Sequence, residues 1–145
     1  MPGMHARQLI NRPIEEVFAF FLNLERTIME TDPKVESVRK VTDGPVGPGT
    51  TYVISQPVFG RVREQRTVFT AVEPNRRIEF EARFGPVAPH LSLTFQRLPS
   101  GTEVTLTGDS RPVGPFRLVT GLMDRIGERN WVRRLGLIKQ VLEKS

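Results

Sequence analysis

The chain has 145 residues, 38% of them hydrophobic and 26% charged, which is typical of one globular domain and excludes a disordered chain. It contains no cysteine, which excludes disulfides and thiolate chemistry, and no stretch approaches the roughly 18 apolar residues of a membrane span. The N-terminal residues have no signal-peptide pattern, so we expect a single cytoplasmic domain over residues 1–145.

The net charge is +5, and much of the excess lies in residues 116–145, which hold seven Arg or Lys and three Asp or Glu. A surface for nucleic acid, anionic lipid or an acidic partner would carry such an excess. A solvated outer face is the favoured interpretation, because Asp124, Glu128 and Glu143 alternate with the cations. No aromatic stacking platform accompanies the cations, so nucleic-acid binding is not expected.

The N-terminal part predicts a short strand at His5–Ile10 and then two short helices. Pro13 begins an amphipathic helix that reaches Leu24, and the acidic Glu15 and Glu16 favour its positive end. A second short helix is expected over Leu24–Glu30.

Six strand-like runs follow, separated by turn sequences rich in Gly, Pro and Asn. Their hydrophobic residues alternate, as in an antiparallel sheet with one buried face. In the third run Val68 and Phe69 compete for the buried face, so its inward parity stays open. The expected strands are Val35–Thr42, Thr50–Gln56, Arg61–Glu73, Arg77–Phe84, His90–Leu98 and Thr102–Ser110.

A long helix is expected from about Pro115 to the C-terminus, with an apolar stripe that rotates near Gly127. A sheet of so many consecutive strands must curl, and only this helix is long enough to fill it. Because such a grip rarely packs solid, we expect a cavity that binds an apolar molecule. The stripe has two sets of residues, one of Val119, Met123, Ile126, Leu137 and Val141, the other of Trp131, Leu135, Ile138 and Leu142.

Three proline-rich loops repeat a motif: Pro-Val-Gly-Pro at 45–48 and 112–115, and Pro-Val-Ala-Pro at 86–89. Rigid loops are the favoured interpretation. In an up-and-down meander the connections near 57–60, 85–89 and 111–115 fall at one end, where Phe59 would belong to an apolar rim around the cavity mouth. A partner-binding or membrane-touching rim would have the same composition.

The order of these elements resembles the START, polyketide-cyclase and birch-allergen superfamily (SRPBCC) over about residues 5–143. The resemblance rests on Ile10–Phe18, Gly44–Thr50, Glu73–Ile78, the phrases Leu93-Thr-Phe and Gly101–Thr105, and the long last helix. It implies an α+β helix-grip fold, with a seven-stranded antiparallel sheet around the C-terminal helix and two short helices at its base. Members of the superfamily bind lipids, sterols, polyketides or hormones, and some are cyclases or hydrolases. They share no catalytic residue, so none is assigned here.

The candidate ligand-binding residues are mostly apolar side chains that would line the cavity. A buried Tyr52 hydroxyl would need a polar partner or a ligand, although a plain core tyrosine is the alternative. His90 could exchange a proton with a ligand or be a surface histidine, and Arg66 could face inward or belong to a solvated edge. The set is Phe20, Phe21, Met29, Tyr52, Phe59, Arg66, Phe80, His90, Phe95, Met123, Asn130 and Trp131.

Binding of a hydrophobic small molecule by a monomer or homodimer is therefore the first hypothesis, without metal or cofactor, since His5 and His90 have no ligand-like spacing. A polyketide cyclase or dehydratase is the rival, with His90, Tyr52 or Glu64 as the acid–base group. An enzyme of that kind should aim two titratable side chains at one point in the cavity. A regulatory or interaction protein that uses the basic last helix is the third possibility.

Overall fold

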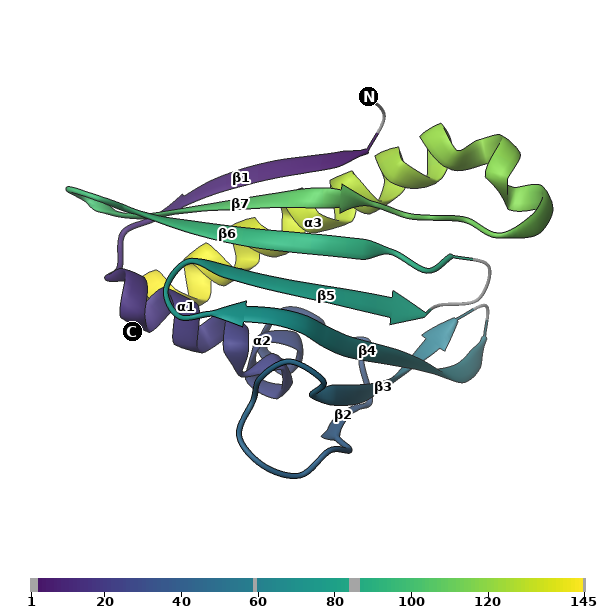
Figure 1. Ribbon diagram of the computed structural model, residues 1–145, viewed down its shortest axis with the longest axis horizontal. Helices are drawn as coiled ribbons and strands as arrows, with labels where there is room; N and C mark the ends of the chain where they lie inside the picture. Colours follow the sequence, from purple (N-terminus) through teal and green to yellow (C-terminus); the bar gives the residue numbers. More distant parts are fainter. Residues whose placement is uncertain (1–2, 59, 84–86, 145) are drawn as a thin grey trace.

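A computed structural model describes residues 3–58, 60–83 and 87–144. A seven-stranded antiparallel sheet faces one long helix, and two short helices lie at one end of it (Figure 1). The elements are β1 (Met4–Ile10), α1 (Ile14–Leu22), α2 (Leu24–Thr31), β2 (Ser37–Lys40), β3 (Thr51–Val58), β4 (Arg61–Glu73), β5 (Arg77–Arg83), β6 (His90–Leu98), β7 (Gly101–Asp109), the 3₁₀ turn η1 (Gly114–Val119) and α3 (Thr120–Lys144).

The strand order is β1-β7-β6-β5-β4-β3-β2, so the first strand pairs with the last one and the remaining strands form a meander. The predicted helix-grip architecture is thus confirmed. The predicted first strand at His5–Ile10 corresponds to β1, and the predicted strand at 35–42 is shorter, because only Ser37–Lys40 pairs with β3.

The parity of β4 is resolved by a register shift between Phe69 and Ala71. Thr67 and Phe69 are buried, whereas Arg66 is exposed, so the odd-numbered residues before the shift point inward. After the shift Val72 lies opposite the buried Ile78 and packs against the core. The bulge lets Phe69 and Val72 share one face although their numbers differ in parity.

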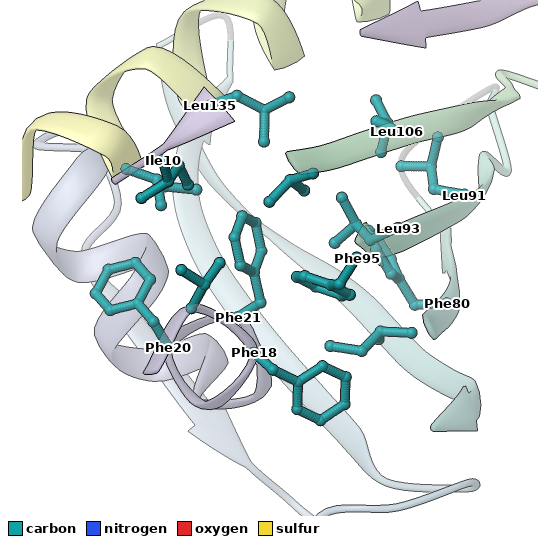
Figure 2. Packing of buried hydrophobic residues seen from close by; sticks show 14 of the residues in the cluster. Ile10, Phe18, Phe20, Phe21, Phe80, Leu91, Leu93, Phe95, Leu106 and Leu135 are labelled. Atoms are coloured by element: carbon teal, nitrogen blue, oxygen red, sulfur yellow. The ribbon is translucent and has the colours of Figure 1, made fainter. Parts of the chain in front are cut away.

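The main core joins the concave face of the sheet to α1 and the C-terminal half of α3 (Figure 2). Phe95 of β6 makes edge-to-face contacts with Phe18 and Phe21 of α1, with ring centroids 5.1 and 5.4 Å apart. Leu135 and Ile138 of α3 close this end of the interior and are almost fully buried. The base of the grip is therefore filled by side chains of the protein itself.

On α3 the second predicted apolar set forms the core stripe, and Val141 of the first set packs against it. Leu135, Ile138 and Leu142 are buried, but Val119 and Ile126 of the first set are exposed. The prediction that Val119 and Ile126 belong to the buried stripe was wrong. The reason is that Asp124 occupies the buried position of the N-terminal half.

Asp124 ties the N-terminal half of α3 to the end of β7. Its Oδ1 accepts hydrogen bonds from the Ser110 backbone N–H at 2.8 Å and from the Ser110 hydroxyl at 2.6 Å. Its Oδ2 is buried and has no partner among the described residues. A buried carboxylate held in this way fixes where the helix begins to cross the sheet.

We expect Asp124→Ala to lower the free energy of unfolding by about 1–3 kcal/mol, because both Ser110 donors would be left buried without an acceptor. Asp124→Asn retains an oxygen acceptor and should lose less. Urea unfolding followed by circular dichroism measures both variants. An alanine variant as stable as the parent would show that the contact contributes nothing.

Candidate ligand-binding site

A row of aromatic side chains crosses the concave face of the sheet from β3 to α3. Tyr52 and Phe69 have ring centroids 5.7 Å apart, Phe69 and Phe80 are 6.3 Å apart, and Phe80 and Trp131 are 6.0 Å apart. These separations lie within the range of favourable aromatic contacts. We call these four residues the aromatic row.

The row follows from the strand register. Tyr52 lies opposite Thr67 and Phe69 lies opposite Phe80, so β3, β4 and β5 each point one ring toward the interior. Trp131 projects from the sheet-facing side of α3 and is half-buried. The fold thus builds one continuous apolar wall from four different elements.

A hydroxyl group lies at the β3 end of the row. Tyr52 is only 2% exposed, and its hydroxyl makes no hydrogen bond with any described residue. Burial raises the pKa of Tyr52, and the negative charge of Glu25 on α2 adds to the effect. An apolar interior with one unpaired phenol offers a single polar contact to an occupant.

A guanidinium group lies at the α3 end. The Arg134 guanidinium carbon is 5.4 Å from the centroid of the Trp131 ring, and Nη2 is 3.6 Å from Oδ2 of Asp32. Burial lowers the pKa of Arg134, and the Asp32 carboxylate opposes that effect. The row is therefore bounded by one neutral and one charged polar group.

Because Tyr52 is the only tyrosine, absorbance near the tyrosinate band titrates this residue alone. We expect a midpoint above 10.0 in the folded protein, since burial disfavours the phenolate. The raised pKa implies stability that is complete below pH 10 and is lost as the pH rises toward the folded-state pKa. A midpoint at or below that of free tyrosine would contradict the burial of the Tyr52 side chain.

The predicted site residues fall into distinct groups. Phe20, Phe21 and Phe95 are buried, but they belong to the filled base of the core around α1 (Figure 2). Tyr52, Phe80 and Trp131 form most of the aromatic row, and Met123 is half-buried on α3. Phe59 lies outside the described residues.

Four predicted residues do not face the interior. Met29 is 50% exposed on α2, and Asn130 is exposed on α3. Arg66 points to the outer face, because the odd-numbered residues of β4 before the register shift point inward. His90 also lies on the outer face, where its Nε2 is 3.6 Å from Oε1 of Glu81. The possible inward position of Arg66 was wrong, and both Arg66 and His90 lie on the outer face, in line with the surface alternative given for each.

The buried titratable groups do not converge on one point. Tyr52 is on β3, whereas Asp124 contacts Ser110 directly after β7. Four strand spacings separate these positions, which is roughly 20 Å along the sheet. The acid–base candidates His90 and Glu64 are on the outer face or exposed.

Sequence reasoning left the inward position of Phe69 open and missed the burial of Asp124. The bulge hid the inward parity of Phe69, and Asp124 looked like a surface charge among arginines. No local sequence signal marks the burial of Asp124, because it depends on the contact with Ser110.

Two hollows are found on the outer face of the sheet. One, of about 560 Å³, is lined by residues such as Thr94, Gln96 and Thr105, which alternate with the buried Leu93 and Val104. The other, of about 280 Å³, includes Arg66, Arg83 and Arg111. Neither lies between the sheet and α3.

No helix within residues 3–58, 60–83 and 87–144 combines the length and the hydropathy required to cross a membrane. In the same part of the chain, no three His, Asp or Glu side chains come together as a metal site would require.

Solved structures with the same architecture cover nearly the whole chain. The crystal structure of Ara h 8.0201 superposes with a TM-score of 0.77 at 13% identity, covering 99% of this chain and 98% of that one. TTHA0849 from Thermus thermophilus gives 0.74 at 21% identity, with 99% of each chain covered. The di-domain ARO/CYC BexL from the BE-7585A biosynthetic pathway gives 0.79 at 20% identity, where this chain spans 47% of that protein.

These likenesses show that the protein has the same helix-grip fold as those structures. A family model described as polyketide cyclase/dehydrase and lipid transport matches residues 1–143. The chain belongs to that family. A comparison with curated protein sequences gives no significant match.

Proposed function

We propose that this protein binds an apolar small molecule along the aromatic row, between the sheet and α3. The observation that supports the proposal is the aromatic row, at whose β3 end the Tyr52 hydroxyl forms no hydrogen bond with a described residue. A ligand oxygen that bonds to this hydroxyl would gain affinity.

The apolar rings of the aromatic row indicate which class of ligand would fit. Aromatic rings offer contact area to a lipid, polyketide or isoprenoid chain, and Tyr52 would orient one hydroxyl or carbonyl group. The description of the family, which includes lipid transport, supports the same class. BexL is an ARO/CYC protein of a biosynthetic pathway, which agrees with a polyketide-like ligand.

The arrangement supports binding over acid–base catalysis. Tyr52 is the only titratable group in the aromatic row, and Asp124 lies near β7, four strands away from β3. A cyclase of the kind considered above needs two such groups at one point.

The single tryptophan provides the test. A neutral fluorescent probe such as N-phenyl-1-naphthylamine, bound beside Trp131, should accept energy from the indole and quench its emission. The competitors 1-octanol and octane then report on the polar contact. We expect octanol to displace the probe better than octane by more than their water solubilities explain.

In Tyr52→Phe this extra preference should fall by about fivefold, the value of one hydrogen bond. Probe binding itself should persist, because the apolar wall is unchanged. If the probe does not quench Trp131, or if Tyr52→Phe leaves the octanol preference intact, the proposed site is wrong.

A further inference from the structure

The N-terminal half of α3 exposes apolar side chains on the side that faces away from the sheet. Leu118 at the end of η1 is 91% exposed, Leu122 is 58% exposed and Ile126 is 52% exposed. At 100° per residue, Leu122 and Ile126 lie on the opposite side of the helix from the buried Asp124 and Leu135. These residues therefore contribute nothing to the core of the protein.

Unpaired cations surround this apolar surface. Arg117, Arg125, Arg129 and Arg133 are exposed, and within the described parts of the chain none of their side chains has a hydrogen bond or an ion pair. On the helix, the last three fall with Leu122 and Ile126 within an arc of roughly 100°. We call Leu118, Leu122, Ile126 and these four arginines the outward patch.

The nearby carboxylates are already engaged. Asp124 is buried against Ser110, and Glu128 accepts a hydrogen bond from the backbone N–H of His5 at 2.8 Å. Neither forms an ion pair with an arginine of the outward patch within the described parts of the chain. The alternation of acids with arginines in the sequence therefore does not place an acid in direct contact with these cations.

The position of the outward patch leaves it accessible to a flat surface. Figure 1 shows η1 and the beginning of α3 extending past the ends of β1 and β7. None of the η1 residues is buried, and the exposed Val113 and Phe116 continue the apolar surface there. A projecting end of this kind can touch a plane without hindrance from the sheet.

We propose that the outward patch docks this protein on an anionic lipid surface. An amphipathic helix with apolar residues in one stripe and arginines beside it lies in the membrane interface, with its apolar side chains in the headgroup region. Each arginine near such a surface adds attraction to anionic headgroups. Docking is independent of the proposed ligand site, because the two use opposite sides of α3.

Vesicle flotation tests the proposal with the intact protein. Vesicles of phosphatidylcholine alone should retain little protein, whereas vesicles that also contain phosphatidylglycerol should retain most of it at low salt. Raised salt should release the protein, since the attraction is screened. Failure to bind the anionic vesicles would overturn the proposal and would leave an acidic protein as the fitting partner.

Three double variants locate the contact. Leu122→Ser/Ile126→Ser and Arg125→Gln/Arg129→Gln should each lower vesicle partitioning by about tenfold or more. Arg66→Gln/Arg83→Gln is the matched control, because it removes the same charge from the outer face of the sheet. Equal loss in the control would mean diffuse attraction by net charge and would overturn the proposal.

Two further readouts separate this proposal from its alternatives. All three variants should quench with the neutral probe as the parent does, so a failed ligand site and a failed membrane contact give different results. Analytical ultracentrifugation without lipid should give the same mass for parent and Leu122→Ser/Ile126→Ser. A parent dimer that this variant dissociates would show that a second copy covers the outward patch, and membrane docking would be excluded.

Discussion

Replacing Gly101 by alanine is expected to destabilise this protein by about 2–4 kcal/mol and to lower Tm by roughly 10 °C. A Cβ at this position would lie 2.2 Å from the carbonyl oxygen of Ile10 and 2.9 Å from the Cα of Asn11. Gly101 also has φ +155°, a conformation that L side chains rarely adopt. The contacting atoms are backbone, so they cannot move aside as the end of a side chain could.

The expected loss has a structural meaning, because Gly101 begins β7 where β1 ends against it. Ile10 pairs with Thr102, and the hairpin from β6 must pass close to this pair. Gly136→Ala is the control, since its new Cβ would meet nothing within 4 Å on α3. It should stabilise the protein by up to about 1 kcal/mol through helix propensity. Thermal unfolding gives the Tm of both variants. A Gly101→Ala variant with the Tm of the parent would contradict the close approach of β1 to the β6–β7 turn.

Phe80→Ala is expected to cost about 3–5 kcal/mol of stability, because the ring is buried and joins Phe69 to Trp131. Phe95→Ala should cost a similar amount, since Phe95 is equally buried against Phe18 and Phe21. The two phenylalanines are thus matched for stability, but only Phe80 belongs to the aromatic row.

The milder leucine variants distinguish the two positions by ligand affinity. Phe80→Leu should weaken binding of the neutral probe severalfold, whereas Phe95→Leu should leave the probe affinity unchanged. Urea unfolding establishes that both variants are folded before the titration. Equal weakening by the two variants would place the probe outside the aromatic row.

Most of the architecture could be predicted from the sequence, because it depends on local patterns. Alternation in Leu91, Leu93 and Phe95 gave the buried face of β6 correctly, and the helical spacing of Val17, Phe18 and Phe21 gave the core side of α1. Proline and glycine turns separated the strands as expected. These signals act over a few residues, which is the range that a sequence pattern reports.

The site was harder to predict, because its residues depend on contacts that are distant in the sequence. The bulge at Phe69 reverses the parity of β4, so Arg66 could not be placed on the outer face from alternation alone. Asp124 is buried only because Ser110 supplies two donors to it. On α3 that buried carboxylate turns Ile126 outward, so an apolar residue at helical spacing became surface.

The membrane contact and the ligand site would together give α3 two roles, one on each side. Trp131 belongs to the aromatic row, while Leu122 and Arg129 face away from the sheet. A protein that takes up an apolar molecule benefits from contact with the phase in which such molecules dissolve. The two proposals are still tested separately, since each has its own variants and its own readout.

Chemical-shift mapping with a neutral apolar probe shows whether an apolar ligand lies between the sheet and α3. We expect the Trp131 indole and the ring signals of Tyr52, Phe69 and Phe80 to shift together as the probe is added. Shifts confined to the outer face, around Thr94 and Thr105 or around Arg66 and Arg83, would contradict this expectation.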